Sequence, residues 1–129
     1  MANIPLFGSL SAKQLAAVDS LVTTIDVPSG RDLMHQGEAG REFILVIKGE
    51  AEVRRGGEVI AVRGPGSFFG EMSLLLDRPR NATIVAKTDM TIDVIDRPAF
   101  RQLLEQYPDL YEPLLKATAQ RLAEMDESA

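Results

Sequence analysis

A glutamate and an arginine lie nine positions apart near the middle of the chain, within the glycine-marked stretch from Gly66 to Thr83. Gly70 directly precedes Glu71, and glycine allows positive φ or close backbone approach, which a residue with a Cβ resists. The residues after Gly70 are good helix formers, so the sequence predicts one short helix there. A helix that opens directly after a glycine leaves its first N–H groups unpaired, and these donors form an anion site.

The two charged side chains of this stretch suit two different parts of one ligand. Arg80 can fold back beside the start of the expected helix, where its planar guanidinium can donate two parallel hydrogen bonds to a phosphate. Glu71, when ionised, only accepts hydrogen bonds and therefore seeks hydroxyl donors such as those of a ribose. These residues indicate a phosphate held beside a sugar hydroxyl. An arginine–glutamate pair in a glycine-rich turn is also compatible with a purely structural role, and both interpretations stay open at this point.

The elements around this stretch are predicted to be a helix, then short strands, then helices. Ser11 and Gln14 form a capping box, so we expect a helix from about Ala12 to Leu21. The β-rich runs that follow are Thr23 to Val27, Asp32 to His35, Phe43 to Ile47, Ala51 to Arg54, Glu58 to Arg63, Ala82 to Ala86 and Met90 to Ile95. Gly56-Gly57 indicates a tight hairpin turn of the primed type. Short strands at this spacing predict an antiparallel barrel or sandwich, often a jelly roll.

The pattern returns to helix at Asp96, which is expected to cap a helix that has Pro98 in its first turn. Phe100, Leu103 and Leu104 form the apolar face of that helix. Beyond Pro108, further residues recur at helical spacing, and we interpret most of them as core packing or a dimer face. They are Leu110, Tyr111, Leu114, Leu115, Thr118, Leu122 and Met125.

The amino-acid composition limits the classes of function that this chain can have. The 129 residues suffice for one domain, and 45% apolar with 26% charged residues is ordinary for a globular chain. The net charge of −5 gives no general electrostatic affinity for nucleic acid or anionic lipid, so an anion site has to be built locally. The chain has no cysteine and no recognisable signal peptide, which fits a cytoplasmic location. No apolar run is long enough to span a membrane, so no membrane partner is expected.

The central stretch resembles the phosphate-binding cassette of the cyclic nucleotide-binding domain family, whose pattern is roughly F-G-E, a small residue, an apolar pair and then P-R-x-A-T. The matching residues are Phe69-Gly70-Glu71, Ser73, Leu74-Leu75, Pro79-Arg80 and Ala82-Thr83. Pro28, Gly30, Gly37 and the run from Phe43 to Glu50 are similar to the early strands of that family. The resemblance covers nearly the whole chain and implies a single domain over residues 1–129. The implied fold is mainly β: an antiparallel β-roll of about eight strands with an N-terminal helix, a short cassette helix and C-terminal helices.

The resemblance also implies a ligand and the residues that bind it. Arg80 would pair with the exocyclic phosphate of a cyclic nucleotide, and Glu71 would accept the ribose 2′-OH. The Gly70 backbone would lie close to the same sugar, and N–H groups at Ser73 and Asn81 would complete the phosphate cradle. The remaining members of the expected site are Met72, Ala82 and Thr83, of which Thr83 could hydrogen-bond the phosphate or the base.

The choice of base depends on the position of Asn81. In the family a small residue there goes with cyclic AMP, whereas a hydroxyl favours cyclic GMP. An amide leaves both open, and we expect cyclic AMP. Binding would order the cassette and draw in the C-terminal helices, through which a homodimer or an effector domain is the expected partner.

Other functions were weighed against this one. A nucleotide-free scaffold or dimerisation module of the same fold would be expected to lack Arg80 or Glu71, and both are present. A transcription factor of the catabolite-activator type needs a helix-turn-helix after the last helix, which this chain does not encode. His35 is the sole histidine, so no catalytic triad, no multi-histidine metal site and no enzymatic activity are expected. Asp89, Asp93 and Asp96 are interpreted as solvated strand faces.

Overall fold

Two four-stranded antiparallel sheets face each other in the computed structural model, which describes residues 11–70, 79–80 and 82–128. The strands are β1 (Thr23–Val27), β2 (Asp32–Met34), β3 (Glu42–Lys48), β4 (Ala51–Arg55), β5 (Glu58–Arg63), β6 (Phe68–Phe69), β7 (Thr83–Ala86) and β8 (Met90–Asp96). One sheet has the order β1-β8-β3-β6 and the other β2-β7-β4-β5. This arrangement confirms the predicted mainly β fold with antiparallel strands and flanking helices.

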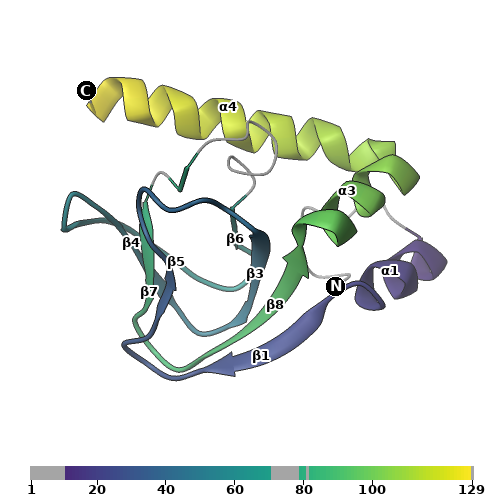
Figure 1. The fold of residues 1–129 in the computed structure, drawn as a ribbon, viewed down its shortest axis with the longest axis horizontal. Coiled ribbons are helices and arrows are strands. Elements are labelled where there is room, and N and C mark those ends of the chain that lie inside the picture. Colours follow the sequence, from purple (N-terminus) through teal and green to yellow (C-terminus); the bar gives the residue numbers. More distant parts are fainter. Residues whose placement is uncertain (1–10, 71–78, 81, 129) are drawn as a thin grey trace.

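The helices gather on one side of the first sheet. They are α1 (Ala12–Asp19), α3 (Arg97–Gln106), the short 3₁₀ helix η2 (Pro108–Leu110) and α4 (Tyr111–Ser128). Figure 1 shows α1 and α3 near the ends of β1 and β8, with α4 lying across the top of the β-roll. The predicted cassette helix after Gly70 lies outside the described residues, as does the segment before Ser11.

Strands β3 and β8 of the first sheet are buried on both faces, which explains the near-continuous apolar run in β3. Phe43 and Leu45 belong to a cluster beneath the helices, whereas Ile44 and Val46 belong to a cluster between the two sheets. The helix-side cluster consists of Val18, Phe43, Leu45, Ile95, Phe100, Leu103, Leu104, Leu110 and Leu114. Because α3, η2 and α4 all contribute to it, the C-terminal helices are anchored directly on strands β3 and β8.

Asp93 corrects one sequence interpretation, because it is only 7% exposed rather than part of a solvated face. It lies opposite Thr24 on β1 and Leu45 on β3, in a row that faces the helices. The Thr24 hydroxyl donates a 2.6 Å hydrogen bond to Oδ1 of Asp93. The alternation of polar and apolar residues along β8 suggested a solvent-exposed face, but the helices cover that face. A buried carboxylate needs a hydrogen-bond donor, and Thr24 supplies it.

Several local predictions are confirmed. Ser11 and Gln14 form the capping box of α1, which ends at Asp19, slightly before the predicted end. Gly56 and Gly57 both have positive φ, as a primed two-residue hairpin turn requires. Asp96 caps α3 by accepting a hydrogen bond from the Ala99 N–H. The two-residue strand β6 was not predicted, because Phe68 and Phe69 stand between glycines with no run of their own.

The apolar residues that recur at helical spacing beyond Pro108 divide into buried and exposed ones. Leu110 and Leu114 are buried in the helix-side cluster, as predicted for core packing. Tyr111 and Leu115 are 42% and 53% exposed. The side chains of Thr118, Leu122 and Met125 are not among those described. In the part of the chain that the structure describes, no helix is both long and apolar enough to cross a membrane.

Candidate functional site

Arg80 is a buried cation, 8% exposed, held by the loop between β2 and β3. Its main-chain N–H donates to the Glu38 carbonyl at 2.7 Å, and its own carbonyl accepts from the Gly37 N–H at 2.8 Å. These two hydrogen bonds pair the backbone of Arg80 with that loop as in a short strand ladder. The position from which the side chain starts is therefore set by the main chain of Gly37 and Glu38.

The guanidinium of Arg80 points to two main-chain carbonyls from neighbouring strands. Nη2 donates to the Glu42 carbonyl at 2.7 Å and Nη1 to the Gly70 carbonyl at 3.3 Å. Glu42 begins β3 and Gly70 follows β6, and these strands pair with Ile44 opposite Phe69. These two carbonyl oxygens accept from different nitrogens of the guanidinium, so together they fix its orientation.

Gly70 has φ of +99° and stands against the Arg80 side chain. A Cβ at residue 70 would lie 2.5 Å from Nη1 of Arg80 and 2.5 Å from the Glu42 carbonyl oxygen. Only glycine fits here, since both the backbone conformation and the lack of space exclude a side chain. This gives the glycine of the predicted cassette a specific structural task.

A polar hollow of about 390 Å³ opens beside Arg80. Its walls come from the end of β2, the following loop and the start of β3, and its lining residues are Leu33, Met34, His35, Glu38, Ala39, Arg41, Glu42 and Arg80. Two arginines and two glutamates share this lining, so charge here is balanced locally despite the acidic composition of the whole chain.

The other predicted site residues divide into two groups. Ala82 is buried in the cluster between the sheets, and the hydroxyl of Thr83 accepts a 3.0 Å hydrogen bond from the Gln36 N–H. Thr83 is the first residue of β7 and Ala82 precedes it, so this strand follows Arg80 closely in the chain. The members that lie outside the described residues are Glu71, Met72, Ser73 and Asn81.

Sequence reasoning missed the loop from Gly37 to Glu42 as part of this site. Glu38 and Glu42 contact Arg80 through main-chain carbonyls, and any residue type can supply a carbonyl. The signal that could have pointed to the loop is Gly37, which has φ of +89°.

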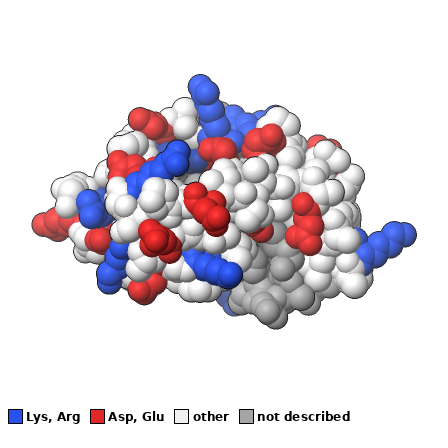
Figure 2. All heavy atoms as spheres, turned by 90° about the horizontal axis from the view of Figure 1, so that it is seen from below, with Lys and Arg blue, Asp and Glu red and all other residues white. Residues whose placement is uncertain are grey.

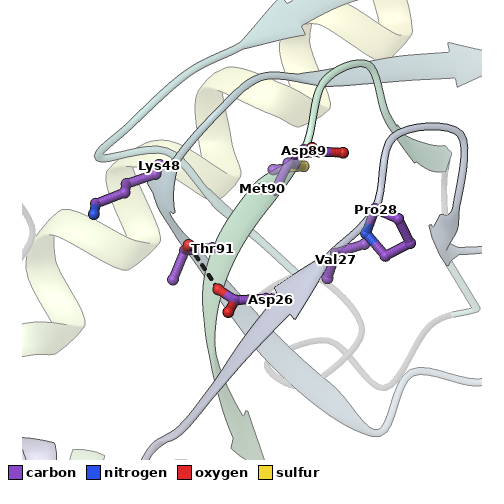
Figure 3. Close-up of a pocket in the computed structure, with 7 residues that line it drawn as sticks. All are labelled: Asp26, Val27, Pro28, Lys48, Asp89, Met90 and Thr91. Atoms are coloured by element: carbon purple, nitrogen blue, oxygen red, sulfur yellow. Dashed lines mark hydrogen bonds between the residues drawn. The ribbon is translucent and has the colours of Figure 1, made fainter.

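A second hollow, of about 560 Å³, lies at the turns next to β1 and β8 (Figure 3). Figure 3 shows Lys48, Asp26 and Asp89 on its walls, with Asp26 bonded to the Thr91 hydroxyl at 2.9 Å. Asp89 accepts from the Ser29 N–H at 2.9 Å. Both carboxylates are thus engaged in holding strands and turns together, and no predicted cassette residue lines this hollow.

Potential metal-ligating side chains are not clustered in the described parts of the chain. Among those residues, no three histidine, cysteine, aspartate or glutamate side chains are grouped to hold a metal ion. His35 instead lies 2.9 Å from Asp32, with both side chains exposed. The face shown in Figure 2 intersperses basic with acidic side chains, unlike the basic surface that binds nucleic acid.

Comparison with known proteins links this geometry to one family. The family model described as cyclic nucleotide-binding domain matches residues 24–107. The cAMP-dependent protein kinase regulatory subunit of Schizosaccharomyces pombe is 34% identical over 109 residues, which is 84% of this chain and 26% of that protein. The chain therefore spans about a quarter of this curated relative.

Solved structures give the same result. The catabolite activator protein of Thermus thermophilus has a TM-score of 0.84 at 32% identity, covering 96% of this chain and 61% of that one. The cAMP-bound PfPKA-R (141-441) has a TM-score of 0.83 at 25% identity, covering 97% of this chain and 44% of that one.

Proposed function

Because this chain belongs to the cyclic nucleotide-binding domain family, we propose that it is a single regulatory domain that binds cyclic AMP in preference to cyclic GMP. The observation that carries the proposal is Arg80, a buried guanidinium oriented by the carbonyls of Gly70 and Glu42. A buried arginine held in this way suits a bidentate interaction with a phosphate. The names of the kinase subunit and of the cAMP-bound structure support cyclic AMP as the ligand.

In this proposal the phosphate and the sugar are recognised by different groups. Arg80 pairs with the exocyclic phosphate, and N–H groups of Ser73 and Asn81 complete its cradle. Glu71 accepts the ribose 2′-OH while the Gly70 backbone stands close to the sugar. Met72, Ala82 and Thr83 complete the site, and the Thr83 hydroxyl remains able to donate, since the bond from Gln36 uses it as an acceptor.

The output of the domain is proposed to pass through the C-terminal helices. Binding orders the cassette, and contacts made only in the bound state shift α3 and α4. Tyr111 and Leu115, exposed at the start of α4, offer a surface for a second copy or for an effector domain. The domain itself is proposed to have no catalytic activity and to act in the cytoplasm, in keeping with the family and with the absence of cysteine.

Calorimetric titration with cyclic AMP, cyclic GMP and 5′-AMP tests this assignment. We expect saturable binding of cyclic AMP, weaker binding of cyclic GMP, and little heat with 5′-AMP, which lacks the cyclic phosphodiester. A rise in melting temperature should accompany binding, since a ligand of the native state stabilises it. If neither cyclic nucleotide produces heat or a thermal shift at millimolar concentration, the fold serves as a nucleotide-free scaffold instead.

A further inference from the structure

We propose that the main chain from Gly37 to Glu42 positions Arg80 and connects it mechanically to the start of α3. This inference rests on the proposed function, because the signal it transmits is the binding of a phosphate at Arg80. The segment, which we call the linking loop, joins β2 to β3. Gly37 is its positioning residue: it contacts Arg80 through the main chain and has no side chain to offer a ligand.

The first part of the argument is the number of attachments between the linking loop and Arg80. Three hydrogen bonds join them: Arg80 N–H to Glu38 O, Gly37 N–H to Arg80 O, and Arg80 Nη2 to Glu42 O. All are 2.8 Å or shorter. The loop therefore holds both the backbone and the charged end of Arg80, and the two must move together.

The second part is the other attachment of the same loop. The Arg41 carbonyl accepts the main-chain N–H of Arg97, the first residue of α3, at 3.0 Å. The next carbonyl along the chain, that of Glu42, accepts from Arg80. Two consecutive peptide groups thus bind the helix on one side and the arginine on the other, because consecutive carbonyls of an extended strand point to opposite sides.

The third part is the path beyond Arg97. Phe100, Leu103 and Leu104 of α3 are packed in one cluster with Leu110 and Leu114. A tightly packed interior transmits small displacements, so a shift at the start of α3 reaches η2 and α4. The linking loop therefore provides a direct route from the phosphate to the helices, separate from the cassette.

Gly37 allows a test of the positioning role with a matched control. Gly37 and Gly30, on opposite sides of β2, both have φ of +89° and no atom within 4 Å of an added Cβ. Alanine at either position introduces similar backbone strain without a clash, but only Gly37 is bonded to Arg80. We expect Gly37→Ala to weaken cyclic AMP binding about tenfold, or about 1.4 kcal/mol, within the range of such strain. Gly30→Ala should lower the melting temperature similarly and leave the affinity unchanged.

Gly37→Asn serves as a milder variant, since asparagine tolerates positive φ better than alanine. Its affinity should lie between those of the wild type and Gly37→Ala. If Gly37→Ala does not fold, the comparison is made between Gly37→Asn and Gly30→Asn. Equal affinities for the two members of a pair would overturn the positioning role.

Arg97 allows a test of the connection to α3. Arg97→Pro removes the N–H that Arg41 accepts, and proline is well tolerated at the first position of a helix. Arg97→Ala removes the same side chain but keeps the N–H. Hydrogen exchange of α3 amides is measured with and without saturating cyclic AMP. We expect a ligand-induced change in the wild type and in Arg97→Ala, and a clearly smaller change in Arg97→Pro, in which only the cassette still acts on α3.

The outcomes separate this inference from the proposed function. If the wild type binds no cyclic nucleotide, both are overturned. If the wild type binds cyclic AMP but the exchange of α3 responds equally in Arg97→Pro and Arg97→Ala, only the connection through the linking loop is wrong.

Discussion

The Cα of Gly70 lies so close to the Arg80 guanidinium that a Cβ on residue 70 would stand 2.5 Å from Nη1. The Gly70 carbonyl accepts a hydrogen bond from the same Nη1. One glycine thus supplies both the space and an acceptor for the arginine, which explains why the two residue types occur together in this stretch.

Replacing Gly70 by alanine should therefore damage both stability and binding. The methyl group would force Arg80 and the Glu42 carbonyl apart and would strain a backbone at φ of +99°. We expect a loss of about 2–4 kcal/mol in the free energy of unfolding, from strain and overpacking combined. Urea denaturation and cyclic AMP titration measure the two effects. Gly64→Ala is the control, because nothing lies within 4 Å of its Cβ position. Equal effects of the two substitutions would contradict the tight contact.

The proposed contact between Glu71 and the ribose 2′-OH predicts that loss of either partner weakens binding to a similar degree. Glu71→Gln should weaken binding of cyclic AMP about tenfold, because a carboxylate is the better acceptor from a hydroxyl. The wild type should bind 2′-deoxy cyclic AMP comparably weakly. In a double-mutant cycle, the variant should hardly distinguish the two ligands. Full additivity of the two losses would show that Glu71 does not contact the 2′-OH.

The buried pair of Thr24 and Asp93 predicts a stability effect distant from the ligand. Thr24→Val removes the 2.6 Å donor of a carboxylate that is 7% exposed, which should cost about 1–3 kcal/mol. Thr91→Val is a matched control, since Thr91 donates to the exposed Asp26 and should cost less than about 0.5 kcal/mol. Chemical denaturation measures the free energy of unfolding of each variant. Equal costs would mean that burial adds nothing at Asp93.

Two neighbouring leucines at the start of α4 should behave differently. Leu114 is 1% exposed in the helix-side cluster, so Leu114→Ala should cost about 2–4 kcal/mol of stability. Leu115 is 53% exposed, and Leu115→Glu should change stability little. If the wild type is a homodimer that pairs through α4, the Leu115→Glu variant should sediment as a monomer in sedimentation velocity. An unchanged dimer would place the interface elsewhere.

Much of the fold could be predicted because its signals are local. The capping box at Ser11 and the glycine pair at Gly56 each depend on a few adjacent residues, and the structure confirms both. Asp93 could not be placed correctly, because its burial depends on helices that pack over β8 from other parts of the chain. Strand β6 escaped detection because two residues show no periodicity, and it is held by pairing with β3.

The site was predictable to the extent that it uses side chains. Arg80 and Gly70 stand out by residue type, and the structure brings them into contact. The carbonyls of Glu38 and Glu42 were not predictable, because a main-chain acceptor leaves no mark on residue type. Only the turn at Gly37 hints at the loop that carries them.

Titration of cyclic AMP into the wild type, Arg80→Lys and Arg80→Ala tests the central claim most directly. Arg80→Ala should weaken binding by about 2–4 kcal/mol, roughly 30- to 1000-fold, because a buried charged partner of the phosphate is lost. Arg80→Lys should fall between, since lysine keeps the charge but lacks the planar fork. Thermal melts without ligand confirm that each variant is folded. If Arg80→Ala is folded and binds cyclic AMP as tightly as the wild type, the buried arginine is structural and the phosphate site lies elsewhere.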